Sequence, residues 1–150
     1  MMIWESMIDS AVGPCIGVLL GFMINYCYIF HNNQKRASTY RDSIKKELRY
    51  CMDLLGESKG KLLPTDNWDT LVASGSLWLL GPEEVNKLCE IYHKIRSYNY
   101  EAKRTRDLAE MSRNHPDNKI IFDNWKGASS KLGIISDELK KIIGDFIEKA

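Results

Sequence analysis

The sequence predicts an all-α protein in which one N-terminal transmembrane helix is followed by a small antiparallel helical bundle. Three observations lead to this fold class. Residues 11–30 contain no charged side chain, and an α-helix needs about 20 such residues to cross a bilayer. Apolar residues then recur every three or four positions, which is the period of an amphipathic helix. All 21 Lys and Arg residues follow residue 30, as expected for a single-pass anchor.

The apolar segment 11–30 is interpreted as an uncleaved anchor. A cleaved secretory signal carries positive charge before its apolar run and a small-residue cleavage site after it. Residues 1–10 contain Glu5 and Asp9 but no basic residue, and no small-x-small site follows Phe30. A buried helix of a soluble protein is the other alternative, and the length and flanks of the segment favour the anchor. The positive-inside rule then predicts a cell-membrane protein with residues 1–10 outside and the C-terminal domain in the cytoplasm.

Within this segment, Gly13, Gly17 and Gly21 recur every fourth residue and therefore share one helix face. Rows of small residues let two helix backbones approach closely in lipid. We therefore expect this face to mediate self-association into a homo-oligomer, although glycine is also simply common in transmembrane helices. Asn25 is the one strongly polar side chain of the span, which is little material for an ion pathway.

Residues 31–60 form the predicted juxtamembrane region. The apolar residues Ile44, Leu48, Cys51 and Leu55 predict an amphipathic helix over residues 38–58. Residues 31–50 carry six basic residues against two acidic ones, and such clusters contact anionic lipid headgroups. The candidate headgroup contacts are Lys35, Arg36, Arg41 and Lys45.

Charge and cysteine content exclude several other functions. The formal net charge of the whole chain is +1, which does not suit a nucleic-acid-binding domain. The four cysteines include no C-x-x-C pair, so neither a zinc site nor a disulfide framework is indicated.

Residues 61–150 are expected to form a cytosolic helical bundle that begins with a short, strongly punctuated unit. Thr65 and Asp66 precede a short helical pattern and offer a side-chain oxygen for an N-cap. The apolar run 77–80 follows, and packing in the core is its ordinary explanation. The alternative is an exposed patch for a protein partner, made by Trp68, Leu77 and Trp78.

Two long helices complete the expected bundle. Gly81-Pro82-Glu83-Glu84 is a typical helix start, with proline in the first turn and carboxylates near the helix N-terminus. This helix is predicted over residues 82–112, and the next over residues 117–149. The second helix carries a heptad-like seam of Ile121, Trp125, Ala128, Leu132, Ile135, Leu139, Ile142 and Phe146. An antiparallel pair with the helix of residues 38–58 as a third member is the simplest arrangement.

No motif predicts catalysis, a cofactor or a metal. Glu90 and His93 have the Glu-x-x-His spacing of di-iron bundles, but those sites need two such motifs. Residues 56–60 match G-x-S-x-G, but no strand pattern precedes them, as a nucleophile elbow requires. Tyr92, Tyr98, Asn99 and Tyr100 suit either a polar ligand or hydrogen bonds at a helix–helix seam.

The order of a short N-terminal span, a basic helix and a spaced pattern of residues also allows a comparison with a known class. The pattern over residues 15–100 resembles small uncharacterised membrane-anchored helical proteins of bacteria, archaea and their mobile elements. It comprises Leu63-Pro64-Thr65, Trp68, Ser74-Gly75, Leu79, Glu84, Leu88, Ile91-Tyr92, Ile95 and Asn99. The resemblance implies an all-helical cytosolic domain without known catalytic residues, and it implies no activity.

These observations predict a non-enzymatic, membrane-anchored interaction or scaffold module that associates with itself, contacts anionic lipid and has a possible protein partner. The alternative is a small oligomeric effector that perturbs the membrane or forms a channel. A helical-bundle enzyme would need a convergent polar site, and the sequence offers none.

Overall fold

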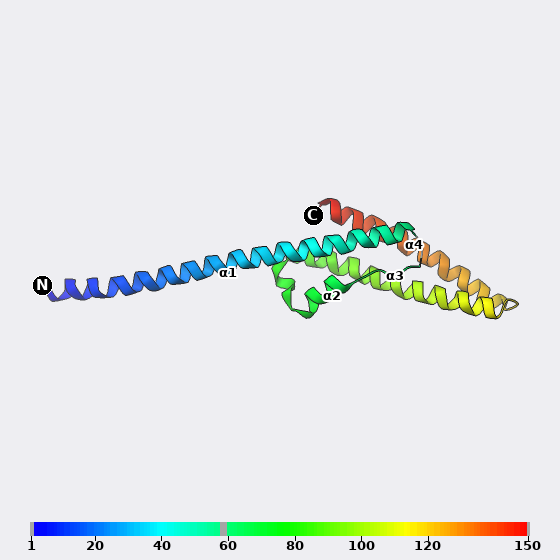
Figure 1. Cartoon of the computed structure of the whole chain (residues 1–150), viewed down its shortest axis with the longest axis horizontal. Coiled ribbons are helices and arrows are strands. Elements are labelled where there is room, and N and C mark those ends of the chain that lie inside the picture. Colours follow the sequence, from blue (N-terminus) through cyan, green and yellow to red (C-terminus); the bar gives the residue numbers. More distant parts are fainter. Residues whose placement is uncertain (1, 58–59, 150) are drawn as a thin grey trace. The chain divides into compact units, whose positions relative to one another are not determined.

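The structure is a computed structural model that describes the backbone of residues 2–57 and 60–149, and the side chains of residues 16–57 and 60–148. Its elements are α1 (Met2–Glu57), α2 (Asp66–Ala73), the 3-10 helix η1 (Ser76–Leu79), α3 (Pro82–Asn114) and α4 (Lys119–Lys149) (Figure 1). No strand occurs in these described ranges. The all-α class is therefore confirmed.

The chain divides into two units, residues 1–39 and residues 40–150. Helix α1 runs through this boundary and contains both the predicted membrane-spanning segment and the predicted juxtamembrane helix. Among the residues described, no helix has both the length and the hydropathy that crossing a membrane requires. Residues 11–15 of the predicted span lie outside the described side chains.

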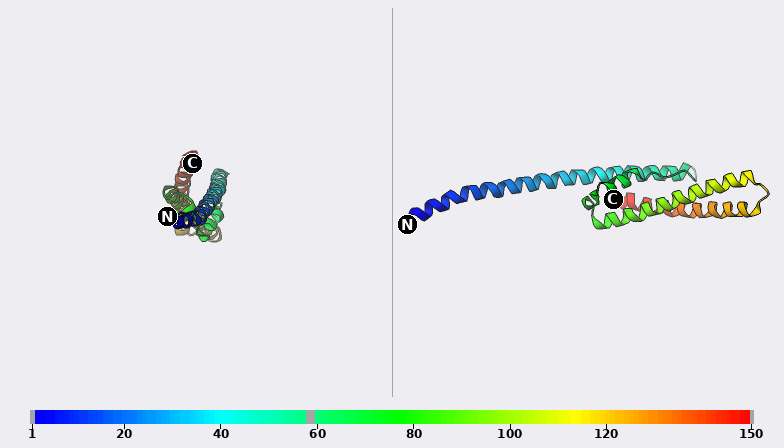
Figure 2. Two further views of the ribbon diagram at one scale, coloured as in Figure 1. Left: turned by 90° about the vertical axis from the view of Figure 1, so that its left-hand side faces the viewer. Right: turned by 90° about the horizontal axis from the view of Figure 1, so that it is seen from below.

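Within the second unit, α3 and α4 form the predicted antiparallel pair (Figures 1 and 2). Lys94 of α3 pairs with Glu138 of α4 at 2.8 Å, and Glu101 of α3 pairs with Lys131 of α4. Residue numbers thus rise along one helix as they fall along the other. The α3 start is also where the Gly-Pro-Glu-Glu signal predicts it, with Pro82 in the first turn.

Residues 40–57 of α1 run parallel to α3, and this orientation departs from a purely antiparallel bundle. Arg41 pairs with Glu84, and Glu47 accepts a hydrogen bond from Tyr92. Residue numbers therefore increase in the same direction along residues 40–57 of α1 and along α3. Because the two helices are parallel, the chain has to return to the start of α3, and residues 60–81 run back in that direction (Figure 2).

This connection turns sharply at two glycines and is held mainly through its backbone. Gly60 and Gly75 have φ angles of +99° and +63°, which favour glycine because a side chain is strained there. The Asn99 side chain donates to the Leu63 carbonyl at 2.8 Å and accepts from the Leu63 N–H at 2.7 Å. The Tyr98 hydroxyl accepts the Gly60 N–H at 3.0 Å. Tyr98 and Asn99 therefore make hydrogen bonds to the connection, whereas the second alternative expected hydrogen bonds between two helices.

The N-cap prediction at Thr65 is only partly correct. Thr65 is the N-cap residue of α2, but its side chain makes no capping hydrogen bond. Its hydroxyl instead donates to the Asp69 carboxylate at 2.7 Å. The first turn already carries the carboxylates of Asp66 and Asp69, which the positive end of the helix dipole favours.

The core of the second unit is shared by α1, α3 and α4, with α2 packed against it. Ile44 and Leu48 of α1, which the helical spacing predicts to face inward, are buried, and so are Ile91 and Ile95 of α3. The remaining core residues are Cys51, Leu54, Leu55, Leu63, Trp68, Leu71, Leu80, Leu88, Tyr92, Tyr98, Ala102, Leu132, Leu139, Ile143 and Phe146.

The buried face of α4 is wider than the predicted seam. Leu132 and Leu139 are buried as predicted, but Ile135 and Ile142 are only half-buried. Ser136 and Ile143, one position further along, are fully buried instead. Because α4 contributes to a core shared with two other helices, its inward face extends beyond a single heptad stripe.

A buried polar group links α1, α2 and α3 inside this core. Glu47 accepts hydrogen bonds from the Tyr92 hydroxyl at 2.6 Å and from the Asn67 N–H at 2.8 Å. The Trp68 ring stacks on Tyr92 at a centroid distance of 4.9 Å. Burial, and then the Glu47 hydrogen bond, raise the Tyr92 pKa well above its usual value. Burial also raises the pKa of the neighbouring Cys51 thiol to about 12, so both groups stay neutral.

Candidate functional site

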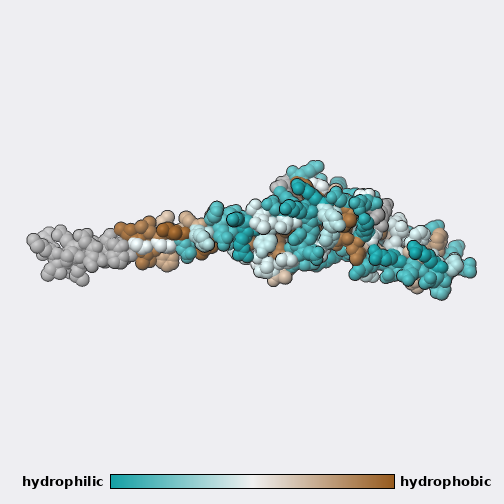
Figure 3. Space-filling view, viewed as in Figure 1, coloured by the Kyte–Doolittle hydropathy of each residue, from teal (hydrophilic) through white to brown (hydrophobic). Residues whose placement is uncertain are grey.

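The first candidate site is the apolar part of α1 over residues 16–30. Its large side chains are exposed, from 48 % for Ile29 to 71 % for Tyr26. They follow one another without a polar face: Val18, Leu19 and Leu20 are successive, and each turns the helix by about 100°. The space-filling view shows this segment as the brown part of α1 (Figure 3). In this part of α1 the apolar residues therefore surround the helix instead of forming one stripe.

The predicted association face is partly described. A Cβ atom added to Gly17 or Gly21 would meet no other atom within 4 Å. Each glycine thus leaves open space on the helix surface, and none of the described side chains fills it. Gly13, the third member of the row, lies outside the described side chains.

The four predicted headgroup contacts have different surroundings. Lys35 and Arg36 are exposed, and Lys45 is half-buried. The Arg41 guanidinium instead binds the Glu84 carboxylate, with Nε–Oε distances of 3.0 and 2.9 Å. Arg41 therefore already has an anionic partner within the bundle.

The three residues of the predicted partner patch do not share one exposed surface. Trp68 is buried, with 5 % of its surface exposed, and belongs to the core. Leu77 is half-buried against the same core, whereas 65 % of Trp78 is exposed. Core packing thus accounts for Trp68, because α2 lays its ring against Tyr92 of α3.

Neither the Glu-x-x-His pair nor the G-x-S-x-G match is joined by a metal-binding cluster among the described residues. Glu90 and His93 both have exposed side chains on α3. The described residues include no group of three His, Cys, Asp or Glu side chains that is placed to hold a metal ion. In the G-x-S-x-G match, Ser58 and Lys59 lie outside the described residues.

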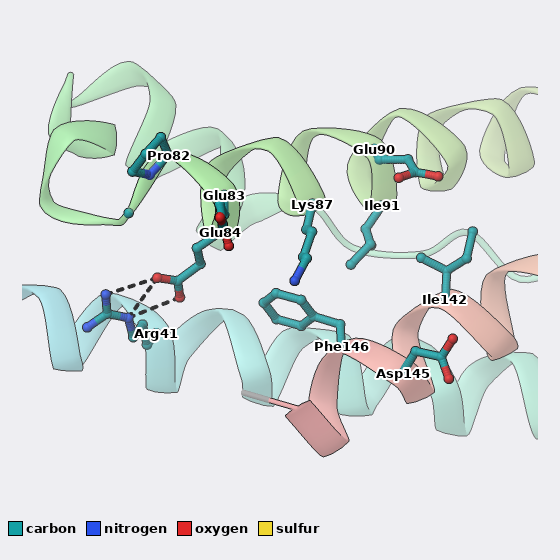
Figure 4. A pocket seen from close by; sticks show the side chains of 11 residues that line it. Arg41, Pro82, Glu83, Glu84, Lys87, Glu90, Ile91, Ile142, Asp145 and Phe146 are labelled. Carbon is teal, nitrogen blue, oxygen red and sulfur yellow. Dashed lines mark hydrogen bonds and ion pairs between the residues drawn. The ribbon is translucent and has the colours of Figure 1, made fainter.

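The second candidate site is a pocket that the sequence analysis missed. It has a volume of about 690 Å³ and lies where the start of α3 and the end of α4 meet α1 near Arg41 (Figure 4). Pockets of this size accommodate small organic molecules. The lining residues are Arg41, Gly81, Pro82, Glu83, Glu84, Lys87, Glu90, Ile91, Ile142, Asp145 and Phe146.

Charge is distributed unevenly around this pocket. Its apolar wall comes from Ile91, Ile142 and Phe146, and its charged groups are four carboxylates and two cations. One carboxylate and one cation of this set, Glu84 and Arg41, neutralise each other in an ion pair. The sequence indicates one part of this pocket, the helix start at residues 81–84. Its other lining residues are spread over positions 41, 87–91 and 142–146 and form no local motif.

The comparisons with known proteins add no relative. No protein-family model matches the sequence, and neither a curated protein nor a solved structure matches it significantly. The resemblance to small membrane-anchored helical proteins therefore stays a prediction.

Proposed function

We propose that the chain is a membrane-anchored, non-enzymatic interaction module in which residues 11–30 cross the membrane. The observation that carries this proposal is the apolar surface of residues 16–30, whose large side chains are exposed around the whole helix. A contiguous exposed apolar surface of this kind marks a site of contact with lipid or protein.

The distribution of this surface favours lipid over a partner helix. A helix that joins a coiled coil needs one apolar stripe and keeps polar residues on its other side. Residues 16–24 offer no such polar side, because the only breaks among their large apolar residues are Gly17 and Gly21. A helix that is apolar all round is typical of a membrane span.

The charges on either side of the segment set the proposed orientation. Residues 1–10 carry two acidic residues and no basic one, while Lys35 and Arg36 follow the segment and are exposed. The positive-inside bias then places the bundle of residues 40–150 in the cytoplasm. Lys35 and Arg36 are free to contact anionic headgroups, each contributing about 1 kcal/mol near the surface.

Self-association through the glycine row is the second part of the proposal. Lipid is as apolar as the helix, so close van der Waals packing is the main energetic gain of helix pairing. Gly17 and Gly21 leave the space that such packing requires. The module would thereby present two or more copies of its helical bundle at the membrane surface.

Alkaline extraction of membranes tests the anchor. The wild-type chain is expected to remain in the membrane pellet. The double variant Leu20→Arg/Ile24→Arg should shift to the supernatant, because each arginine near the span centre costs about 2.5–3.5 kcal/mol. Ile120→Arg/Ile134→Arg is the matched control, since these side chains are 74 % and 59 % exposed on α4. Extraction of the wild-type chain itself, or equal retention of both double variants, would refute the anchor.

A further inference from the structure

The pocket at the start of α3 has a chemical character of its own, independent of the anchoring proposed above. All its lining residues belong to the unit of residues 40–150. Its wall combines the Phe146 ring with Ile91 and Ile142, and its rim carries charges of both signs. Such a combination suits a ligand with an apolar body and one charged group.

The charge that the ligand should carry follows from the ion pairs. Arg41 is engaged by Glu84, so this pair is neutral as a whole. The carboxylates of Glu83, Glu90 and Asp145 have no ion-pair partner among the described residues, and one cation, Lys87, remains beside them. The rim therefore keeps an excess of negative charge.

The arrangement of these groups is directional. Figure 4 shows Glu90 of α3 and Asp145 of α4 on opposite sides of Ile142. The Lys87 side chain extends toward the Phe146 ring (Figure 4). An ammonium group at this rim would be attracted by both carboxylates, and an apolar body attached to it would contact Phe146 and Ile142.

We infer that this pocket binds a small organic cation, an amine joined to an apolar body. The positive group lies at the rim that carries Glu90 and Asp145, and the apolar body lies against Phe146, Ile91 and Ile142. Lys87 is then an internal competitor, because its ammonium group is the same kind of charge in the same pocket. Its removal should improve binding of a cation and weaken binding of an anion.

Calorimetric titration with three indole probes tests this inference on the full chain in nanodiscs, with empty nanodiscs as the blank. Tryptamine is the cation, tryptophol its neutral counterpart and indole-3-acetate its anionic one. We expect tryptamine to bind about five-fold tighter than tryptophol, the ratio typical of partly exposed ion pairs. Indole-3-acetate should bind weakest. Added salt should reduce the advantage of tryptamine, because these charges are screened.

Three variants separate this site from general attraction to the membrane or the protein. Glu90→Gln/Asp145→Asn should remove the difference between tryptamine and tryptophol, and Lys87→Met should raise tryptamine affinity. Glu148→Gln, an exposed carboxylate that does not line the pocket, should change neither. The inference is overturned by equal binding of tryptamine and tryptophol, by tighter binding of indole-3-acetate, or by weaker tryptamine binding in Lys87→Met. If the chain proves not to be anchored, the same titration in buffer keeps the two proposals distinct.

Discussion

Leu132→Asp is expected to unfold the helical bundle. Leu132 is 3 % exposed and lies in the core that α4 shares with α1 and α3. Losing a buried leucine side chain costs about 2–5 kcal/mol. An unpaired carboxylate in the same place adds several kcal/mol more. The sum is comparable with the whole stability of a small domain, about 5–15 kcal/mol.

Circular dichroism with urea titration measures this effect on a fragment of residues 35–150, which we expect to fold without metal. Ile134→Asp is the matched control, because Ile134 lies two residues away on the same helix and is 59 % exposed. Its cost should stay within about 0.5 kcal/mol, as is usual for exposed positions. Equal melting of the two variants would mean that Leu132 does not face a core in solution.

Gly17→Ile is expected to reduce self-association in the membrane without preventing insertion. In a single copy the new side chain meets no atom within 4 Å of its Cβ position, so the change does not disturb the helix through contacts. Between two copies it would hold the backbones apart, and lipid offers no hydrophobic compensation for the lost packing. Isoleucine itself inserts readily.

Crosslinking in membranes measures the oligomer, with Val18→Ile as the control. Val18 is the next residue, is 58 % exposed and lies off the glycine row. Val18→Ile should leave the oligomer unchanged. The same oligomer in wild type and both variants would show that the glycine row is incidental, and assembly would then have to reside in the helical bundle.

The helix positions could be predicted because their signals are local. The Gly-Pro-Glu-Glu start fixed the beginning of α3, and the spacing of Ile44, Leu48 and Cys51 indicated the buried face of α1. Its residues contact one compact core, so the three- and four-residue spacing matches the buried face.

What the sequence could not indicate depends on contacts between distant residues. Ser136 and Ile143 are buried although the predicted seam does not include them, and the parallel course of residues 40–57 depends on the return path of residues 60–81. In the sequence, Trp68 suits both core packing and an exposed partner patch. Its stacking on Tyr92, a residue of another helix, places it in the core. The pocket was missed because its walls come from three helices and its apolar residues look like ordinary core positions.

The most direct test of the anchor is the accessibility of single cysteines on the two sides of residues 11–30. Ser6→Cys and Asn114→Cys are introduced separately into a chain with Cys15, Cys27 and Cys89 changed to serine; Cys51 is buried. A membrane-impermeant maleimide should label residue 6 in intact cells and residue 114 only after lysis. Labelling of residue 114 in intact cells would reverse the orientation, and labelling of neither residue before lysis would contradict a helix that crosses the membrane.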